Sequence, residues 1–295
     1  MSKVSFVQKW FMAIRPSSLI LSAAPVLLGT LLAFADGVGH WRAAFFSFLG
    51  AFLLHILVNL VNDYCDLKKG ADKEGDYDPM RGILVGAIPS EEMKTAIEIV
   101  IALFLVPAAY LILRGGWPIT VIAVTAVASA IFYTAGKRPL GYRGFGDLLV
   151  FVFFGPVAVA GTYYVQSLEM NPAILLAGIA PGLFAAGVLM INNLRDRDRD
   201  KAVNKKTLVV LFGKEFGWCA YHIFIFFACM LPLLIYLLTK QHEITFIAAG
   251  VYFLLLPAMR ILARDSERDA MNQALGLTVQ ACFIYCVLFG IGWFF

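Results

Sequence analysis

The chain has 295 residues, of which 60% are hydrophobic, 14% aromatic and only 15% charged, with a formal net charge of +4. A soluble globular domain carries about 25% charged residues, so this composition excludes an ordinary soluble domain. The sequence therefore indicates an integral membrane protein.

The apolar residues lie in blocks long enough to cross a hydrocarbon core of about 30 Å as helices. We predict nine transmembrane spans, which make residues 1–295 a single membrane-embedded domain. Continuous apolar runs differ from the short alternating strands of a membrane β-barrel, so the predicted fold class is an all-α transmembrane bundle. The spans are expected at 17–35, 43–62, 95–113, 117–135, 147–165, 172–193, 217–239, 244–262 and 272–294.

The positions of the basic residues predict the orientation of the bundle. With a cytoplasmic amino terminus, 21 of the 24 Lys and Arg residues fall in cytoplasmic segments, and only Arg42, Arg114 and Lys240 fall outside. This bias is the one that the positive-inside rule describes. The basic residues alternate with acids beside apolar spans, so the net charge does not indicate a nucleic-acid partner.

Two polar clusters stand at corresponding ends of apolar spans, Val61–Asp66 and Ile191–Asp196. Each places an Asn four residues before an Asp, and each opens into a charged loop. Carboxylates are costly near a bilayer, so acids at the ends of membrane helices are by default functional candidates. The two copies run in the same direction, and an internal repeat of this kind predicts a site between its halves.

The residue types in these clusters predict a Mg²⁺ site. Carboxylate and amide oxygens are hard ligands, and Mg²⁺ binds one or two protein carboxylates together with substrate phosphates. A single acid at a helix end is usually a solvent contact, but two matching clusters facing one compartment argue against that reading. We expect Asp66 and Asp196 to be the principal ligands. The residues expected to assist them are Asn62, Asp63, Asp72, Asn192 and Asp200.

Bases and aromatic residues accompany the acids. Mg²⁺ with Lys and Arg is how proteins hold a diphosphate and stabilise it as it leaves. A metal–diphosphate site at the mouth of an apolar bundle suits a polyprenyl diphosphate. At the end of the fourth span, the ring of Tyr133 is predicted to stabilise an allylic cation, and Lys137 to hold diphosphate or an acceptor carboxylate. The remaining candidate substrate-binding residues are Arg15, Asn59, Arg81, Arg138 and Lys205.

Three motifs carry a resemblance to a known family: Asn62-Asp63-x-x-Asp66, Tyr133-x-x-x-Lys137-Arg138, and Asp196-x-x-x-Asp200 followed by Lys206-Thr207-Leu208. Over essentially its whole length the chain resembles the UbiA superfamily of intramembrane aromatic prenyltransferases. Strings such as Trp10-x-x-x-x-Arg15-Pro16 and Gly141-Tyr142-Arg-Gly144-x-Gly146-Asp147 are most similar to its 1,4-dihydroxy-2-naphthoate branch. Gly70 stands where many members have a third Asp, and this branch has Asp72 nearby instead.

The resemblance implies a nine-helix bundle, Mg²⁺ dependence and a bacterial inner-membrane enzyme whose active site faces the cytoplasm. It implies transfer of a polyprenyl group to 1,4-dihydroxy-2-naphthoate with loss of CO₂ and diphosphate, giving demethylmenaquinone. Prenylation of 4-hydroxybenzoate or another aromatic acceptor is the alternative within the family. A secondary transporter is the alternative outside it, although the acids lie at helix ends beside bases and not at the membrane centre. Membrane lipid is the expected surrounding, and the sequence predicts no oligomeric state.

His55, within the second predicted span, allows two interpretations. It lies near enough to the first cluster to reach the site. A hydrogen-bonded contact between two helices is the interpretation we favour.

Overall fold

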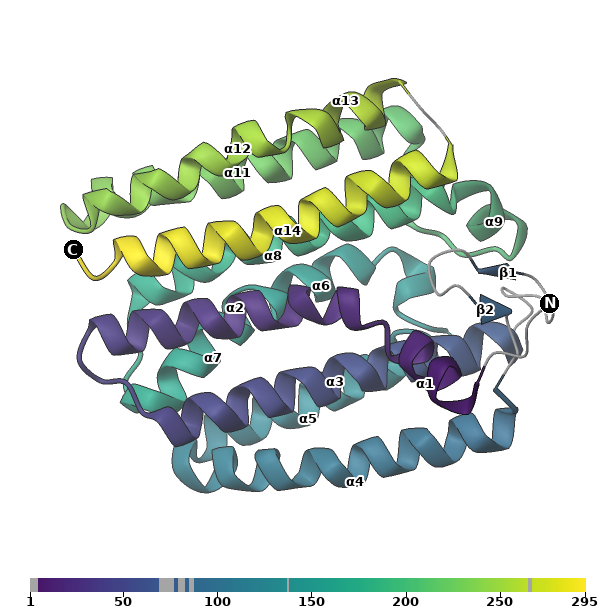
Figure 1. Ribbon diagram of the computed structural model, residues 1–295, viewed down its shortest axis with the longest axis horizontal. Helices are drawn as coiled ribbons and strands as arrows, with labels where there is room; N and C mark the ends of the chain where they lie inside the picture. The colour runs from purple at the N-terminus through teal and green to yellow at the C-terminus, as the bar shows by residue number, and fades with distance from the viewer. Residues whose placement is uncertain (1–4, 69–76, 79–82, 85–87, 137, 265–266) are drawn as a thin grey trace.

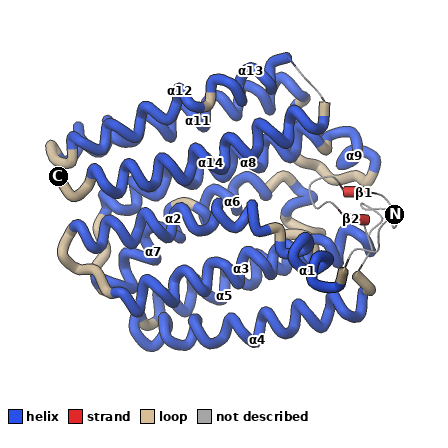
Figure 2. The backbone as a smooth tube through the Cα atoms, viewed as in Figure 1, coloured by secondary structure: helices blue, strands red, loops and turns tan. Residues whose placement is uncertain are grey.

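The structure, a computed structural model, describes residues 5–68, 77–78, 83–84, 88–136, 138–264 and 267–295. Its helices run side by side along one direction, with α1 (Phe6–Ile14) at one end of the bundle and the last turn of α14 (Arg268–Gly292) at the other (Figure 1). The described part is helical apart from short connections and one antiparallel pair of two-residue strands (Figure 2). We call the end that holds α1 the α1 end.

The elements follow one another along the chain with few long connections. In order they are α1, α2 (Pro16–Ala35), α3 (Trp41–Lys68), β1 (Tyr77–Asp78), β2 (Ile83–Leu84), α4 (Ser90–Gly115), α5 (Trp117–Phe132), η1 (Gly141–Arg143), α6 (Gly146–Phe154), α7 (Pro156–Ser167), α8 (Pro172–Arg195), α9 (Arg197–Ala202), α10 (Leu208–Phe212), α11 (Lys214–Thr239), η2 (Glu243–Gly250), α12 (Val251–Leu254), α13 (Leu256–Arg264) and α14.

Among the described residues, eight helical segments are long and apolar enough to cross a membrane. The helix α5 is apolar but has 16 residues, fewer than the others. The predicted all-α membrane fold is therefore confirmed, and the predicted number of nine spans is reached when α5 is counted. The chain is an integral membrane protein.

Two predicted spans are interrupted. The fifth, 147–165, consists of α6 and α7, which meet at Gly155 and Pro156. A Cβ atom on Gly155 would lie 2.7 Å from the carbonyl oxygen of Gly178, so this break lets the chain touch the backbone of α8. The eighth span, 244–262, is divided into η2, α12 and α13. Hydropathy predicts that a segment crosses the membrane, but it does not report such local breaks.

The helices that carry the two polar clusters end at the same end of the bundle (Figure 1). Helix α3 extends to Lys68, six residues beyond the predicted span, because the residues of the first cluster continue the helix. Helix α8 ends at Arg195. The parallel arrangement of the two halves that the repeat predicts is therefore present in the structure.

Helix α8 lies in the core of the bundle, against α6, α7, α11 and α14. Its Phe184 and the rings of Tyr221 and Tyr285 are fully buried. Large apolar residues on the outer helices are exposed instead, for example Leu113 (87%) and Trp117 (77%). In a membrane protein such residues face lipid. The bundle therefore has a packed centre around α8 and outer helices whose exposed side chains contact lipid.

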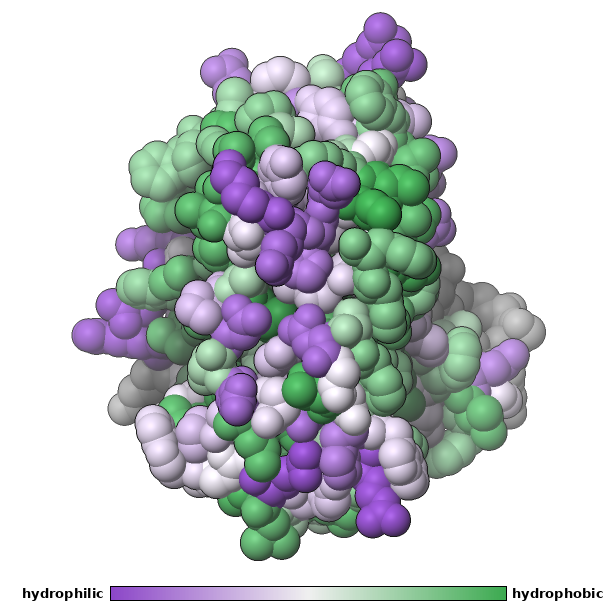
Figure 3. Space-filling model, turned by 90° about the vertical axis from the view of Figure 1, so that its left-hand side faces the viewer, coloured by the Kyte–Doolittle hydropathy of each residue, from purple (hydrophilic) through white to green (hydrophobic). Residues whose placement is uncertain are grey.

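Polar contacts close the end of the bundle opposite the α1 end. Asp36 accepts hydrogen bonds from the Tyr163 hydroxyl at 2.7 Å and from Trp293 Nε1 at 2.8 Å. These bonds join the end of α2 to α7 and to the chain just after α14. Figure 3 shows hydrophilic residues gathered on this end face among hydrophobic ones. The face has the composition expected where a bundle meets water.

Candidate active site

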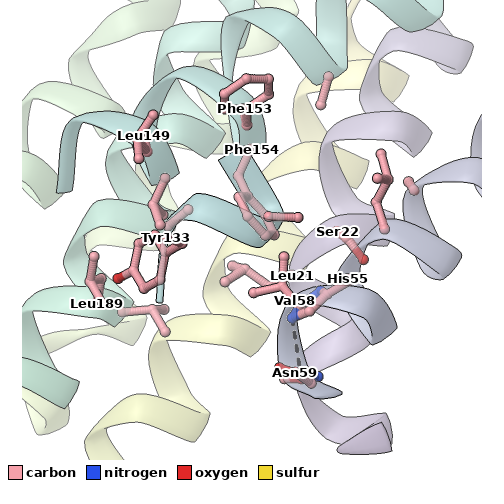
Figure 4. Close-up of a pocket in the computed structure, with 18 of the residues that line it drawn as sticks. Leu21, Ser22, His55, Val58, Asn59, Tyr133, Leu149, Phe153, Phe154 and Leu189 are labelled. Carbon is pink, nitrogen blue, oxygen red and sulfur yellow. Dashed lines mark hydrogen bonds between the residues drawn. The ribbon is translucent and has the colours of Figure 1, made fainter. Parts of the chain in front are cut away.

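A cavity of about 780 Å³ opens among the helix ends at the α1 end and continues between the helices. Figure 4 shows two of its walls: His55, Val58 and Asn59 lie on one, and Tyr133 and Leu189 on the other. The inner lining is apolar and includes Phe104, Ile119, Ile122, Phe153, Phe154 and Val165. The cavity thus joins a polar mouth to an apolar interior.

Most of the described residues that the sequence analysis selected come together at this mouth. Those that line the cavity are Arg15, Asn59, Asn62, Asp66, Tyr133, Asn192, Asp196, Asp200 and Lys205. They come from the junction of α1 and α2, from α3, from the end of α5, from α8 and α9, and from the segment after α9, and residues of both polar clusters line this one cavity.

Three other selected residues are not described by the structure, and two do not line the cavity. Lys137, Asp72 and Arg81 fall outside the described residues. Arg138 is exposed and does not line the cavity, and Asp63 does not line it either. Asp63 instead accepts a hydrogen bond of 2.5 Å from Arg15, because it lies one residue round the helix from the face that carries Asn59, Asn62 and Asp66. The predicted roles of these residues stay predictions.

Hydrogen bonds hold the first cluster in place. Asp66 Oδ1 accepts a bond of 2.8 Å from the hydroxyl of Tyr142. The hydroxyl of Thr134 donates to Asn62 Oδ1, and Asn59 Nδ2 donates to the carbonyl of Ile14 at 3.0 Å. The α3 face is therefore tied on one side to the end of α5 and η1, and on the other to α1.

In the second cluster, Asp196 lies between two guanidinium groups. Arg195 Nη2 is 2.6 Å from Asp196 Oδ2, and Arg268 Nη2 is 2.6 Å from Asp196 Oδ1. Arg195 also donates to Asn272 Oδ1 at 2.9 Å. Burial disfavours ionisation of Asp196, but the two guanidiniums outweigh it and hold its pKa below the ordinary value.

Asp200 is buried and paired with one ammonium group. Lys205 Nζ lies 3.3 Å from Asp200 Oδ1. Burial raises the pKa of Asp200 to about 6, and Asp196 and Asp66 add to the rise although Lys205 opposes it. Burial also opposes the charge on Lys205, but the Asp200 and Asp66 carboxylates raise the pKa of its ammonium. Three carboxylates thus interact here, and a further cation would stabilise them.

Two glycines leave space for the side chain of Tyr133. A Cβ atom on Gly141 would lie 2.9 Å from Tyr133 Cε1, and one on Gly146 would lie 2.9 Å from the Tyr133 hydroxyl oxygen. Both distances are shorter than a real contact allows. The ring can occupy its place on the cavity wall only because these positions have no side chain.

Arg15 joins α1 to α2 in a left-handed conformation, with φ of 55°. A residue other than glycine rarely adopts this conformation, which costs about 1 kcal/mol or more and is common at functional sites. Nearby, Ser18 Oγ and His55 Nε2 are 3.4 Å apart. His55 lines the cavity and also makes the contact between helices that the sequence analysis favoured.

The donor set fits a hard divalent cation held jointly with a substrate. Among the described residues, no three His, Cys, Asp or Glu side chains converge closely enough to form a metal site alone. Acids instead approach the cavity from α3 and from α8 and α9. Mg²⁺ suits this arrangement, because it commonly binds one or two carboxylates, several waters and the oxygens of a phosphate.

Four residues that contact the predicted site were not selected from the sequence. Tyr142 and Thr134 bond to the first cluster, and Arg268 and Asn272 bond to the second or to its Arg195. Arg268 carried only the signal of a basic residue at a helix end. Its spacing of four from Asn272 puts both on one face of α14, which is a signal that sequence reasoning could have used.

Residues 22–290 match the UbiA prenyltransferase family. The chain belongs to this family. It is 36% identical over 301 residues to a 1,4-dihydroxy-2-naphthoate octaprenyltransferase of Escherichia coli (strain K12), covering 99% of this chain and 97% of that protein. A protein of the same name from Mycobacterium tuberculosis is 39% identical over 71% of both chains.

Solved structures agree on the fold. A UbiA homolog from Archaeoglobus fulgidus bound to GPP and Mg²⁺ has a TM-score of 0.68 and 16% sequence identity to this chain. The match covers 95% of this chain and 99% of that chain. At this identity the likeness concerns the fold alone. It places the chain in the helical architecture of the family independently of the sequence motifs.

Proposed function

We propose that this protein transfers a polyprenyl group from polyprenyl diphosphate to 1,4-dihydroxy-2-naphthoate, with loss of CO₂ and diphosphate, giving demethylmenaquinol, the reduced form of demethylmenaquinone. The observation that carries the proposal is the cavity, in which two acidic clusters with cationic partners meet above an apolar interior. Relatives named 1,4-dihydroxy-2-naphthoate octaprenyltransferase support the choice of acceptor.

The mouth of the cavity is the proposed diphosphate site. Asp66, Asp196 and Asp200 would hold Mg²⁺ together with Asn62 and Asn192, which line the same space. When bound, Mg²⁺ neutralises charge on the diphosphate. Lys205 and the guanidiniums of Arg195 and Arg268 stand beside the acids, where they can bind the leaving diphosphate and stabilise its developing charge.

Tyr133 is the proposed neighbour of the allylic carbon. Its ring lines the cavity where the polar mouth meets the apolar walls. An aromatic face attracts a cation, so a ring at this boundary stabilises the positive charge that develops as diphosphate leaves. The prenyl chain extends into the apolar part, between residues such as Ile122 and Phe154.

The acceptor is proposed to enter with its carboxylate towards Arg15, a guanidinium that lines the cavity. The carboxyl-bearing carbon of the ring forms a bond to the allylic carbon, whose bond to the diphosphate oxygen breaks. The carboxylate then leaves as CO₂, and the electron pair of its C–C bond returns to the ring and restores aromaticity. No protein group is consumed in this sequence.

We also propose a bacterial inner-membrane location with the site facing the cytoplasm. The bias of Lys and Arg towards one set of loops supports this orientation. The acids at the α1 end lie next to the same loops, at the ends of the helices. This position argues against a transporter, which would carry its acids at the membrane centre.

The fate of the acceptor carboxyl group tests the function directly. Membranes that contain the protein, given GPP, Mg²⁺ and dihydroxynaphthoate labelled in its carboxyl group, are expected to release labelled CO₂ in amounts equal to the prenylated product. Absence of labelled CO₂ together with prenylation of 4-hydroxybenzoate, which keeps its carboxylate, would replace this acceptor by the alternative one.

Removal of either principal acid tests the metal–diphosphate site. Asp66→Ala and Asp196→Ala are expected to lower turnover about 10²- to 10³-fold, because each removes a preorganised group that stabilises charge. Asp198→Ala is the matched control, since its side chain is 85% exposed in the same segment. Steady-state turnover at saturating Mg²⁺ is the measurement, and a normal rate in either variant would contradict the assignment.

Because Gly141 and Gly146 leave space for Tyr133, a larger residue at either position should displace the ring without removing it. Gly146→Ala is expected to lower kcat about 10-fold or more, because the new methyl group pushes the phenol from its place. Gly250→Ala is the control, because nothing lies within 4 Å of the Cβ atom it would add. Tyr133→Phe should keep activity and Tyr133→Ala should lose it. Full activity in Gly146→Ala or Tyr133→Ala would count against the role of the ring.

Labelling from the two sides of the membrane tests orientation. In a background without the five native cysteines, Cys introduced at Asp198 and at Glu169 should react from opposite sides, since both positions are exposed at opposite ends of the bundle. A membrane-impermeant maleimide added to whole cells should label only position 169. Labelling of position 198 alone would reverse the proposed orientation.

A further inference from the structure

The two acidic clusters come from segments about 130 residues apart, and their like charges oppose their approach. Asp66 lies near the end of α3, whereas Asp200 lies in α9. A bound metal would draw them together, but the site must present them at a suitable separation before the metal arrives. Tyr142 of η1 contacts Asp66 of the first cluster and also Lys205, the ion-pair partner of Asp200.

The hydroxyl of Tyr142 donates to Asp66 Oδ1 at 2.8 Å, which fixes the rotation of that carboxylate. The ring of the same residue lies under a cation: Lys205 Nζ is 5.6 Å from its centroid. Lys205 in turn is paired with Asp200 at 3.3 Å. One side chain therefore connects an acid of the first cluster to an acid of the second through a single ammonium group.

The backbone around Tyr142 is held on two sides. The amide of Gly141 donates to the carbonyl of Tyr133 at 2.9 Å, which anchors η1 to the end of α5. The amide of Lys206 donates to the carbonyl of Tyr142 at 3.0 Å, which anchors the segment after α9 to η1. The turn that follows needs a left-handed residue, and Gly144 has φ of 83°. Tyr142 is thus a fixed point and not a mobile loop residue.

We propose that Tyr142 is a positioning residue that sets the separation of the two acidic clusters so that Mg²⁺ and diphosphate bind between them. This inference rests on the proposed function, because it concerns the metal–diphosphate site of that reaction. Tyr142 acts through Asp66 and Lys205, which themselves contact the bound groups. Groups that orient metal ligands typically change metal affinity about 10- to 100-fold when they are removed.

The test measures metal binding without turnover. Mn²⁺ serves as the probe, and its binding to the purified full-length protein is titrated in the presence of inorganic diphosphate by loss of the free-ion electron paramagnetic resonance signal. Tyr142→Phe removes only the hydroxyl and is expected to weaken binding about 10-fold. Tyr142→Leu also removes the ring and should weaken it about a further 3-fold.

Tyr164→Phe is the matched control. Its hydroxyl donates to the Gly115 carbonyl at 3.0 Å, near the other end of the bundle, so this variant loses one tyrosine hydrogen bond of similar length away from the site. It should bind Mn²⁺ as the wild type does. In Tyr142→Phe the KM for dihydroxynaphthoate should also stay at the wild-type value, because the acceptor site is not altered.

The outcomes separate this inference from the function on which it rests. If the wild-type protein binds Mn²⁺ and the dissociation constant of Tyr142→Phe is within 2-fold of the wild-type value, the proposed role of Tyr142 is wrong while the metal site stands. An equal loss in Tyr164→Phe would assign the effect to general destabilisation and overturn it as well. A wild-type protein without diphosphate-dependent Mn²⁺ binding would overturn both the inference and the proposed metal site.

Discussion

The carboxylates of Asp66, Asp196 and Asp200 repel one another, and the apolar surroundings make each unpaired charge there more costly. The arrangement of the site follows from this constraint. Arg195 and Arg268 flank one acid, and Lys205 pairs with another, all within hydrogen-bonding or ion-pair distance. These bases also contribute to the bias of Lys and Arg that predicts the orientation of the chain, so in the proposed function the same side chains serve both orientation and diphosphate binding.

The constraint also explains the direction of the two halves. Acids at the end of α3 and acids around the end of α8 can share a substrate only if both helices end on the same side of the bundle, as they do (Figure 1). Helical structure continues through the first cluster, and Asn59, Asn62 and Asp66 line the cavity while Asp63, at the edge of the same helix face, pairs with Arg15. The partner of a carboxylate at this helix end therefore depends on its position around the helix axis.

The parts of this structure that depend on local pattern could be predicted. Apolar length gave the membrane-spanning segments, and the matched Asn and Asp spacings indicated which residues line the mouth. Pro156 favours a kink and Gly155 allows a close approach, but the sequence does not show that α8 is the partner at this break, because its contacting residues are distant in the chain. The pairs that Tyr142 and Arg268 form with the acids were missed for the same reason. Their partners lie 76 and 72 residues away, and no local pattern encodes those pairs.

The cavity lining changes from polar at its mouth to apolar in its interior, and this change suits the two parts of the proposed reaction. Departure of diphosphate requires cations and bound metal, but the allylic cation that remains would react with water if the same polar surroundings extended around it. The lining changes from charged groups to side chains such as Leu189 and Phe154 within one continuous space, with Tyr133 also on its wall (Figure 4). An apolar wall excludes water from the carbon, and an aromatic face attracts the cation. In the proposed reaction the position of that ring relative to the acids therefore matters as much as its identity, and this would make Gly141, Gly146 and the η1 segment around Tyr142 part of the same site.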